Sequence, residues 1–390
     1  MKKAILFLSV VLSLLLCSCH PEDPVAPSGI NIGKGVFVLN QGTYMYANAS
    51  LTFYDPEADT AANNLFYRVN GAPIGDVAQS LALINGKLYI VVNNSNYIYK
   101  VDAQTLKCDT TQPYLLDGFI SPRYMLPLAP NKVYLSDLAS SDLYIVDPEE
   151  MTITGTIAMG KPTETMVLVG REVYVTNWSN YYNTSVVNNT VMVVDAQNDL
   201  KVQEIMVGKE PNGIVVDRNG MIWVLCEGAF WDEEEEYPSL WCINPLTKKA
   251  TCERSFASSA AELAIDPQGE YLYCIVDGNV RRISVNSPQS DDPFLISGEG
   301  KTFFKIAVNP LNGDIYVSDA KNYMVNGQVY RYSSDGVLLS SFSAGVCPGY
   351  FLLKGFDYEE TMSKMWQGVR VHPLQGLLVR QGATDGGHSC

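Results

Sequence analysis

Hydrophobic and polar residues alternate with a period of two along most of the chain, in short runs rich in β-branched and aromatic residues. Such runs are typical of β-strands. Residues 170–177 show the pattern plainly, with Val173 and Val175 alternating with Tyr174 and Thr176 before a polar Asn177. Similar runs begin at Gly35, Gly86, Asn131, Gly220, Gly269 and Gly313. Their shared aromatic positions are Phe37, Tyr89, Tyr134, Tyr174, Trp223, Tyr273 and Tyr316, at intervals between 40 and 52 residues. Seven copies at this spacing predict the blades of a β-propeller.

Each repeat is expected to form one blade of four strands, numbered from the first to the fourth along the chain. In the fifth repeat these strands are predicted at 211–217, 221–226, 239–244 and 250–256. The third strand of several repeats ends in Asp or Asn followed by turn residues, at Asp55, Asp102, Asp147, Asp195 and Asn244. Such side chains accept hydrogen bonds from the backbone two residues further on and so start turns. We therefore interpret these Asp and Asn residues as structural and not as catalytic.

The first repeat lacks its first strand, because Gly35 already begins the second one. A segment with the character of the missing strand, Cys347 to Leu353, follows the last repeat. Unpaired sheet edges favour aggregation, and full closure of the ring removes them. We therefore predict an all-β fold, a seven-bladed β-propeller over residues 35–353 whose C-terminal strand completes the first blade. Residues 354–390 carry no blade signature and are expected to form a tail outside it.

Charge and histidine content narrow the functional classes. The 27 basic and 42 acidic residues give a net charge of −15, which argues against nucleic acid as a partner. The three histidines, His20, His372 and His388, lie outside residues 35–353. The propeller therefore cannot build a Ser-His-Asp or Cys-His apparatus or a His-ligated metal site. We expect no catalysis, no metal site and no cofactor, although paired carboxylates among Glu164, Glu227 and Glu262 keep acid–base chemistry open.

The N-terminus reads as an export signal. Lys2 and Lys3 precede an apolar run from Ala4 to Leu16 that is too short to span a bilayer. Residues 16–19, Leu-Cys-Ser-Cys, resemble a bacterial lipobox, which implies lipidation at Cys19 after removal of residues 1–18. Residues 19–34 would then be the lipid anchor and a tether. His20-Pro21-Glu22-Asp23 resembles the surface-export signal of Bacteroidota lipoproteins, which implies an outer-membrane lipoprotein exposed at the cell surface and held by its lipid alone.

Seven cysteines remain beyond Cys19. Cys242 and Cys252 are placed symmetrically about residues 245–249, so they are candidates for a disulfide across a hairpin. The spacings contain no C-x-x-C pair, and zinc is not indicated.

One face of the propeller is expected to bind a ligand. The loops between second and third strands, together with the connections between blades, emerge on the same face and are rich in Tyr, Trp and Asn. Aromatic rings on a rigid scaffold supply contact area at low entropic cost, and amides supply adaptable hydrogen bonds. Single residues of this kind also simply pack loops, so we expect the set on one face, and not any single residue, to form the binding surface. The candidate ligand-binding residues are Tyr44, Tyr46, Tyr97, Phe119, Arg123, Trp178, Tyr181, Tyr182, Phe230, Trp231 and Tyr323.

The motif V-Y-V-T-N at residues 173–177 resembles the YVTN or YncE-like seven-bladed propellers, over residues 35–353. The chain also resembles the BtuG-type surface lipoproteins of Bacteroidota. This resemblance rests on the lipobox, the acidic residues behind it, the opening G-V-F-V-L-N-Q-G and the closing C-P-G-Y-F. This resemblance implies a protein that captures cobalamin or related corrinoids, as a bound ligand, and delivers them to a TonB-dependent outer-membrane transporter. The alternatives are a lactonase-like propeller enzyme and a glycan-binding or protein-docking module.

Overall fold

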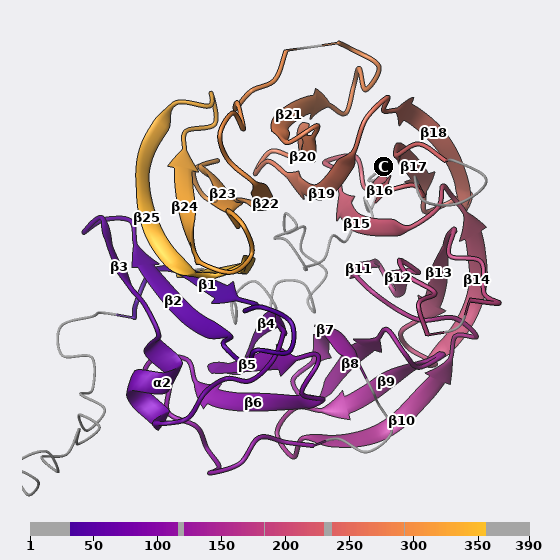
Figure 1. The fold of residues 1–390 in the computed structure, drawn as a ribbon. Coiled ribbons are helices and arrows are strands. Elements are labelled where there is room, and N and C mark those ends of the chain that lie inside the picture. The colour runs from indigo at the N-terminus through magenta and orange to yellow at the C-terminus, as the bar shows by residue number, and fades with distance from the viewer. Residues whose placement is uncertain (1–31, 116–120, 183, 230–235, 292, 356–390) are drawn as a thin grey trace, which may run out of the picture.

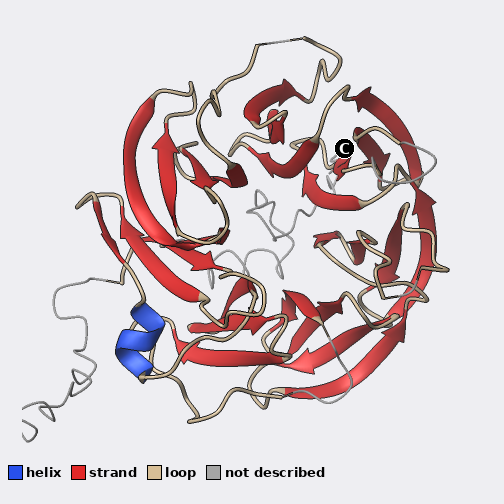
Figure 2. Cartoon of the chain, viewed as in Figure 1, coloured by secondary structure: helices blue, strands red, loops and turns tan. Residues whose placement is uncertain are grey.

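The computed structural model describes residues 32–115, 121–182, 184–229, 236–291 and 293–355. Seven antiparallel sheets stand around a central axis, as Figure 1 shows. Apart from the short helix α2 (Leu65–Asn70), the regular elements of these residues are strands (Figure 2). The predicted all-β, seven-bladed propeller is confirmed. Among the described residues, no helix combines the length and hydrophobicity that a membrane crossing requires.

The blades follow one another along the chain, and the strands of each run in order from the inner strand outwards. Blade 1 contains β26 (Pro348–Lys354), β1 (Gly35–Asn40), β2 (Ser50–Asp55) and β3 (Thr60–Ala62), and blade 2 contains β4 (Ala78–Ile84), β5 (Lys87–Val92) and β6 (Tyr97–Asp102). Blade 3 contains β7 (Pro122–Ala129), β8 (Lys132–Asp137), β9 (Asp142–Asp147) and β10 (Thr152–Ala158), and blade 4 contains β11 (Met166–Val169), β12 (Glu172–Thr176), β13 (Thr190–Asp195) and β14 (Leu200–Met206). Blade 5 contains β15 (Pro211–Val216), β16 (Ile222–Cys226), β17 (Ser239–Asn244) and β18 (Lys249–Ser255), and blade 6 contains β19 (Ala260–Ile265), β20 (Tyr271–Val276) and β21 (Asn279–Ser284). Blade 7 contains β22 (Phe303–Val308), β23 (Ile315–Asp319), β24 (Asn326–Tyr332) and β25 (Leu338–Val346).

Blades 2 and 6 have a shortened outer edge. Where the other blades carry a fourth strand, blade 2 has single bridges, Ile98 to Tyr114 and Val101 to Cys108. Blade 6 has a bridge from Val280 to Ile296. The fourth position is therefore occupied in both, but by short segments that touch the third strand at isolated points.

The C-terminal strand closes the ring as predicted. Strand β26 pairs antiparallel with β1, with Val36 opposite Leu353 and Leu39 opposite Tyr350. Strand β1 therefore has a neighbour on both sides, since β2 pairs with its other edge. Strands β1 and β26, the first and last of the described propeller, therefore lie in one sheet, and the ring has no open edge where its two ends meet.

The repeated aromatic residue fills the wedge between neighbouring blades. Tyr134 on β8 packs in one cluster with Val173 and Val175 on β12 of the next blade. Tyr316 of blade 7 does the same against Val36 and Val38 of blade 1, so the pattern continues across the seam. Burying each such ring contributes on the order of 1.5–3 kcal/mol. The aromatic position that revealed the repeat is therefore the residue that joins each blade to the next.

The Asp and Asn residues at the ends of third strands form the predicted turns. The Asp55 carboxylate accepts a hydrogen bond from the Glu57 N–H at 2.9 Å, and Asn244 accepts one from Leu246 at 2.9 Å. Asp102, Asp147 and Asp195 make equivalent bonds. Backbone N–H groups, that of Thr105 foremost, hold the pKa of Asp102 below its usual range. Their structural assignment is confirmed.

The proposed disulfide between Cys242 and Cys252 is wrong. Both are free thiols, and Cys242 lies opposite Thr251, while Cys252 lies opposite Trp241. The hairpin turn contains four residues, since Asn244 pairs with Lys249, whereas a symmetric Cys pair requires five. A register difference of one residue turns a side chain to the other face of a sheet. Accordingly, Cys242 is buried and Cys252 is exposed.

Candidate functional site

A β-bulge at the start of the inner strand marks six of the seven blades. One extra residue lies there on β4, β7, β15, β19, β22 and β26, between paired positions such as Pro211 and Gly213. Bulges re-aim side chains and are frequent next to functional sites. The residues at these bulges or next to them include Gln79, Arg123, Asn212, Glu262 and Lys305.

Blade 4 places Glu164 at the same level, two residues before β11. We call the six residues Gln79, Arg123, Glu164, Asn212, Glu262 and Lys305 the mouth ring. Each inner strand runs antiparallel to the second strand, so its first residues lie beside the last residues of that strand. The mouth ring therefore lies on the face where the loops to the third strands begin, which we call the loop face. The opposite face carries the short turns and is called the turn face.

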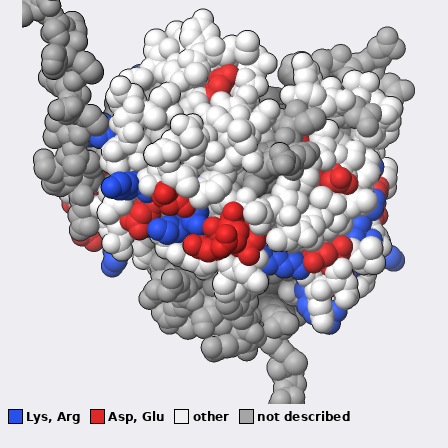
Figure 3. Space-filling model, turned by 90° about the horizontal axis from the view of Figure 1, so that it is seen from below, with Lys and Arg blue, Asp and Glu red and all other residues white. Residues whose placement is uncertain are grey.

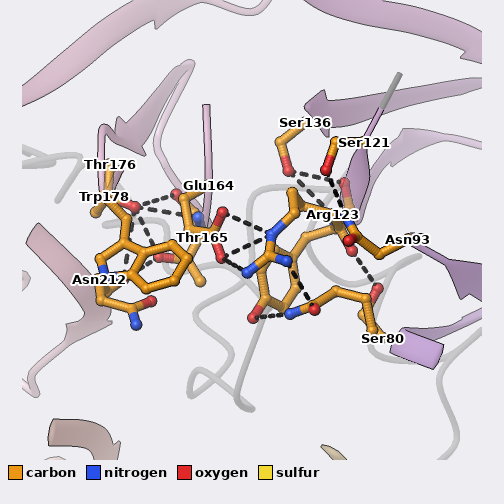
Figure 4. Close-up of polar contacts among 12 residues, drawn as sticks. Ser80, Asn93, Ser121, Arg123, Ser136, Glu164, Thr165, Thr176, Trp178 and Asn212 are labelled. Atoms are coloured by element: carbon orange, nitrogen blue, oxygen red, sulfur yellow. Dashed lines mark hydrogen bonds and ion pairs between the residues drawn. The ribbon is translucent and has the colours of Figure 1, made fainter. Parts of the chain in front are cut away.

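Arg123 and Glu164 form the most extensively hydrogen-bonded part of the mouth ring that the structure describes. The Arg123 Nε donates to Glu164 Oε2 at 2.8 Å, and Nη2 donates to Oε1 at 2.7 Å. Nη1 donates to Gln79 Oε1 at 2.8 Å, and the Gln79 amide donates to the Tyr124 hydroxyl at 3.0 Å. Figure 4 shows the Arg123 guanidinium facing the Glu164 carboxylate. Burial disfavours the Arg123 charge, but Glu164 and its hydrogen bonds outweigh this, so the pKa of Arg123 is raised.

Trp178 lies next to this ion pair, at the beginning of the blade 4 loop (Figure 4). The Arg123 guanidinium carbon is 5.4 Å from the Trp178 ring centroid, within the range of a cation–π contact. The indole Nε1 donates to Glu227 Oε2 at 3.1 Å, and Asn212 Nδ2 donates to Glu227 Oε1 at 2.8 Å. Glu227 thus takes both hydrogen bonds from neutral donors. Burial raises the pKa of this carboxyl above its ordinary value.

Lys305 and Glu262 complete the charged part of the ring with a second ion pair. Burial disfavours the Lys305 charge, but the attraction of Glu262 prevails, so the pKa of Lys305 is raised. Glu262 has a φ of 59°, an uncommon left-handed conformation for this residue type. Such strain at a concave site is typical of functional positions.

The inner strands and the mouth ring line a pocket of about 130 Å³, with Asn212, Glu262 and Lys305 of the ring in its wall. Tyr124, Thr165 and Tyr350 add further polar groups, and the remaining lining residues are apolar. A ligand much larger than this pocket must bind at least in part above the mouth ring, among the loops.

The blade 4 loop, described over residues 177–182 and 184–189, carries two exposed aromatic rings that contact each other. Tyr181 and Tyr182 are 76% and 53% exposed and meet edge to face, with ring centroids 5.1 Å apart. Asn188 Nδ2 donates to the Trp178 carbonyl at 2.8 Å, and Asn180 Nδ2 donates to the Val186 carbonyl at 2.7 Å. The amides therefore fold the loop while the rings remain on its surface.

The loops of blades 7, 1 and 2 are connected in a similar way. Thr43 Oγ1 donates to the Tyr323 carbonyl at 2.8 Å, which ties the blade 1 loop to the blade 7 loop. The buried Asp76 carboxylate accepts the Met45 N–H at 2.9 Å and the Asn94 amide at 2.6 Å, which ties it to blade 2. These contacts hold Tyr44 and Tyr46, each more than half exposed, on an ordered loop.

Charge is distributed unevenly over the surface. Figure 3 shows Lys, Arg, Asp and Glu gathered in a band on the wall, next to broad areas with little charge. Ion pairs such as Lys100 with Glu149 and Lys87 with Asp102 come from third strands and the turn face. By contrast, the loop residues 40–50, 93–97 and 177–190 contain no charged side chain. These three loops are therefore polar but uncharged, whereas the blade 5 segment after β16 carries Glu227 and the acidic residues 232–236, and the blade 7 loop carries Lys321.

The structure places the predicted ligand-binding residues in three settings. Arg123 and Trp178 lie together at the mouth ring, and Tyr44, Tyr46, Tyr181, Tyr182 and Tyr323 are exposed on loops of the same face. Tyr97 instead packs against the core cluster of blades 1 and 2, and its hydroxyl donates to the Ile74 carbonyl at 2.8 Å. Phe119, Phe230, Trp231 and the lipidation site Cys19 lie outside the described residues, as does the tail from residue 356.

Sequence reasoning missed Gln79, Lys305 and the role of Glu227. Gln79 and Lys305 lie one and two residues after the first residue of their inner strands, and Glu227 follows the second strand of blade 5. Because the spacing differs between blades, a repeat pattern does not align these residues. Among the described residues, no cluster of His, Cys, Asp and Glu has an arrangement suited to a metal ion.

Comparison with known proteins identifies the domain and the fold. Residues 34–345 match the profile of DUF5074, a domain of unknown function. A quinonprotein alcohol dehydrogenase-like protein from Bacteroides thetaiotaomicron is 16% identical, with a TM-score of 0.64 over 83% of this chain and 79% of that chain. The Cps50 (Swd1) β-propeller domain of Myceliophteria thermophila is 10% identical, with a TM-score of 0.56 over 78% and 98%. A comparison with curated proteins found no match. At these identities the structural likeness shows the fold alone.

Proposed function

The chain belongs to the DUF5074 family, and we propose that it is a non-catalytic surface lipoprotein that binds cobalamin or a related corrinoid on its loop face. It would deliver this ligand to a TonB-dependent outer-membrane transporter. The observation that carries the proposal is the position of Trp178, half-buried between Arg123 and Glu227 at the mouth ring and flanked by exposed aromatic loops.

A corrinoid suits this surface in shape and polarity. A corrin ring with amide side chains is a broad, partly apolar disc with hydrogen-bond donors and acceptors along its edge. Trp178, Tyr181 and Tyr182 offer rings for the apolar faces, and the uncharged loops offer Asn side chains for the amides. Because these loops are folded by their own hydrogen bonds, little ordering would be required on binding.

The carboxylates at the mouth support binding over catalysis. Glu164 is held by two nitrogens of Arg123, and Glu262 is paired with Lys305. A general base must be able to reach a substrate proton, and a carboxylate that is fully engaged by a cation is a weak one. This pairing disfavours a lactonase-like activity that uses Glu164 and Glu262 as its acid and base.

The cellular part of the proposal comes from the N-terminus. The lipobox-like residues 16–19 and the acidic residues behind Cys19 would place the protein on the outer surface of the outer membrane, held only by a lipid. The transporter is the partner that the resemblance to BtuG-type lipoproteins implies. Co-purification of the full-length lipoprotein with such a transporter from outer membranes tests this part separately.

Calorimetric titration of cyanocobalamin into the soluble protein from residue 20 onward tests the binding function. We expect one-to-one binding, and we expect Trp178→Ala to weaken it by about 30- to 150-fold, because a ring contributes about 2–3 kcal/mol. Tyr271→Ala is the matched control, since Tyr271 is an exposed ring at the start of β20, on the turn face. Absence of binding at micromolar concentrations would refute corrinoid capture, and glycan binding in its place would identify a glycan-binding module.

A further inference from the structure

The mouth ring and Glu227 together carry more negative than positive charge, and their cations are already occupied. The three glutamates are Glu164, Glu227 and Glu262. The two cations, Arg123 and Lys305, pair with Glu164 and Glu262. Arg123 directs Nε, Nη1 and Nη2 to Glu164 and Gln79, and Lys305 is paired with Glu262. A negatively charged ligand group arriving at the mouth would have to break one of these ion pairs to find a cation.

Glu227 is the carboxylate best placed to meet a ligand that stacks on Trp178. Its two oxygens hold the Trp178 indole and the Asn212 amide, so it lies at the edge of the aromatic surface. Each oxygen accepts one hydrogen bond from these donors, and a carboxylate oxygen has room for a second. A primary amide of the ligand can therefore donate an N–H to Glu227, and hydrogen bonds to charged acceptors are stronger than those between neutral groups.

The surrounding loops reinforce this preference. Residues 40–50, 93–97 and 177–190 supply Asn, Ser, Thr and Tyr and neither Lys nor Arg. These side chains can both donate to and accept from an amide. A carboxylate in the same place would lose water without gaining a cation, and it would be repelled by Glu227.

From these observations we infer that the mouth selects neutral, amide-bearing corrinoids against derivatives in which a peripheral amide is a carboxylate. This inference rests on the proposed function and specifies its ligand class. Glu227 is the residue to which the structure assigns the discrimination, because it lies against Trp178 and is hydrogen-bonded to neutral donors, whereas Glu164 and Glu262 are engaged in ion pairs. Selectivity of this kind depends on a repulsive element as much as on an attractive one.

The test compares three ligands of nearly equal size: cyanocobalamin, its monocarboxylic acid derivatives, and the methyl esters of those acids. Their affinities for the protein from residue 20 onward are measured by calorimetry at pH 7. We expect the ester to bind within about threefold of cyanocobalamin and the acid about tenfold or more weakly, because like charges brought together at a binding site are strongly disfavoured. The ester separates charge from size, since it is larger than the acid but neutral.

Two variants assign the effect to its residue. Glu227→Gln removes the charge and keeps a hydrogen-bond acceptor. The difference in affinity between the acid and the ester is therefore expected to shrink to about threefold or less. Glu57→Gln, an exposed glutamate on a turn of the opposite face, is expected to leave the difference unchanged. Circular dichroism and thermal unfolding confirm that both variants are folded. In wild-type protein, raising NaCl from about 50 to 500 mM should also narrow the difference, because salt screens the repulsion.

The outcomes distinguish the two proposals. If all three ligands bind equally well to the wild-type protein, corrinoid capture stands and the selectivity is refuted. If the acid binds weakly but Glu227→Gln leaves the difference unaltered, the assignment to Glu227 is refuted. If cyanocobalamin itself does not bind, the proposed function fails, and the selectivity falls with it.

Discussion

Replacing Arg123 with Met is expected to destabilise the propeller strongly. Arg123 is 8% exposed and Glu164 only 1%, and two Arg123 nitrogens lie within 2.8 Å of the carboxylate. The variant leaves a buried carboxylate without its cation, which typically costs about 3–5 kcal/mol. It also leaves Gln79 Oε1 without the donor now 2.8 Å away, for about 1 kcal/mol more. We therefore expect a loss of about 4 kcal/mol or more in the free energy of unfolding.

Urea unfolding followed by tryptophan fluorescence and by circular dichroism measures this loss, and coincidence of the two curves tests two-state behaviour. Arg171→Met is the matched control, because its side chain is 61% exposed and lies 3.8 Å from Asp195. Exposed pairs of this kind contribute about 0–1 kcal/mol. The double variant Arg123→Met with Glu164→Leu should recover much of the stability, since no charge is left buried alone. A single Arg123→Met variant within about 1 kcal/mol of wild type would contradict the reasoning.

Three further predictions concern the fold. A chain that ends before β26 leaves β1 with an unpaired edge, so we expect aggregation or loss of cooperative unfolding. A stable monomer in size-exclusion chromatography would show that β26 is not needed to close the ring. A thiol reagent should label the exposed Cys252 and spare Cys242, because burial raises the pKa of Cys242 to about 12. Peptide mapping identifies the labelled cysteine, and a disulfide-linked peptide that contains both cysteines would contradict the prediction. The pKa of Asp102 is lowered in the folded state, so its stabilisation is present above about pH 4 and is lost as the pH falls through the folded pKa. Asp102→Asn should therefore lose less stability than wild type between pH 7 and 3, and equal losses in urea unfolding would show that the turn does not depend on the charge.

The repeat, the closure and the turns could all be predicted because each is a local pattern. The aromatic residue of the second strand recurs because every blade meets its neighbour in the same way, as Tyr134 and Tyr316 show. Blade 1 lacks its first strand in the sequence order, and the segment at residues 347–353 follows the last blade, so this segment was predicted to supply the missing strand. The Asp and Asn turns follow from a side chain that binds its own backbone two residues on, and no distant contact is involved.

The hairpin cysteines show where such reasoning ends. Cys242 and Cys252 are separated by a distance that suits a cross-strand pair only if the turn contains five residues. The turn contains four, and a second irregularity shifts the register between Leu240 and Trp241. A change of one residue reverses which face a side chain occupies, and hydrophobic patterning does not determine it at that resolution.

By itself, then, the sequence determined the architecture. Strands with a period of two that bury both faces must pack against neighbouring blades, and seven such blades close into a ring when the C-terminal strand completes the first one. The sequence also shows that the loops of one face carry the aromatic residues. Only the tertiary structure decided the site. Arg123 and Glu164 are 41 residues apart and belong to different blades, and their contact depends on where each inner strand begins. Arg123, Asn212 and Glu262 lie at bulges near the start of their inner strands. Because each pair joins two blades, the paired charges of the mouth ring become visible only when the inner strands of neighbouring blades are placed side by side.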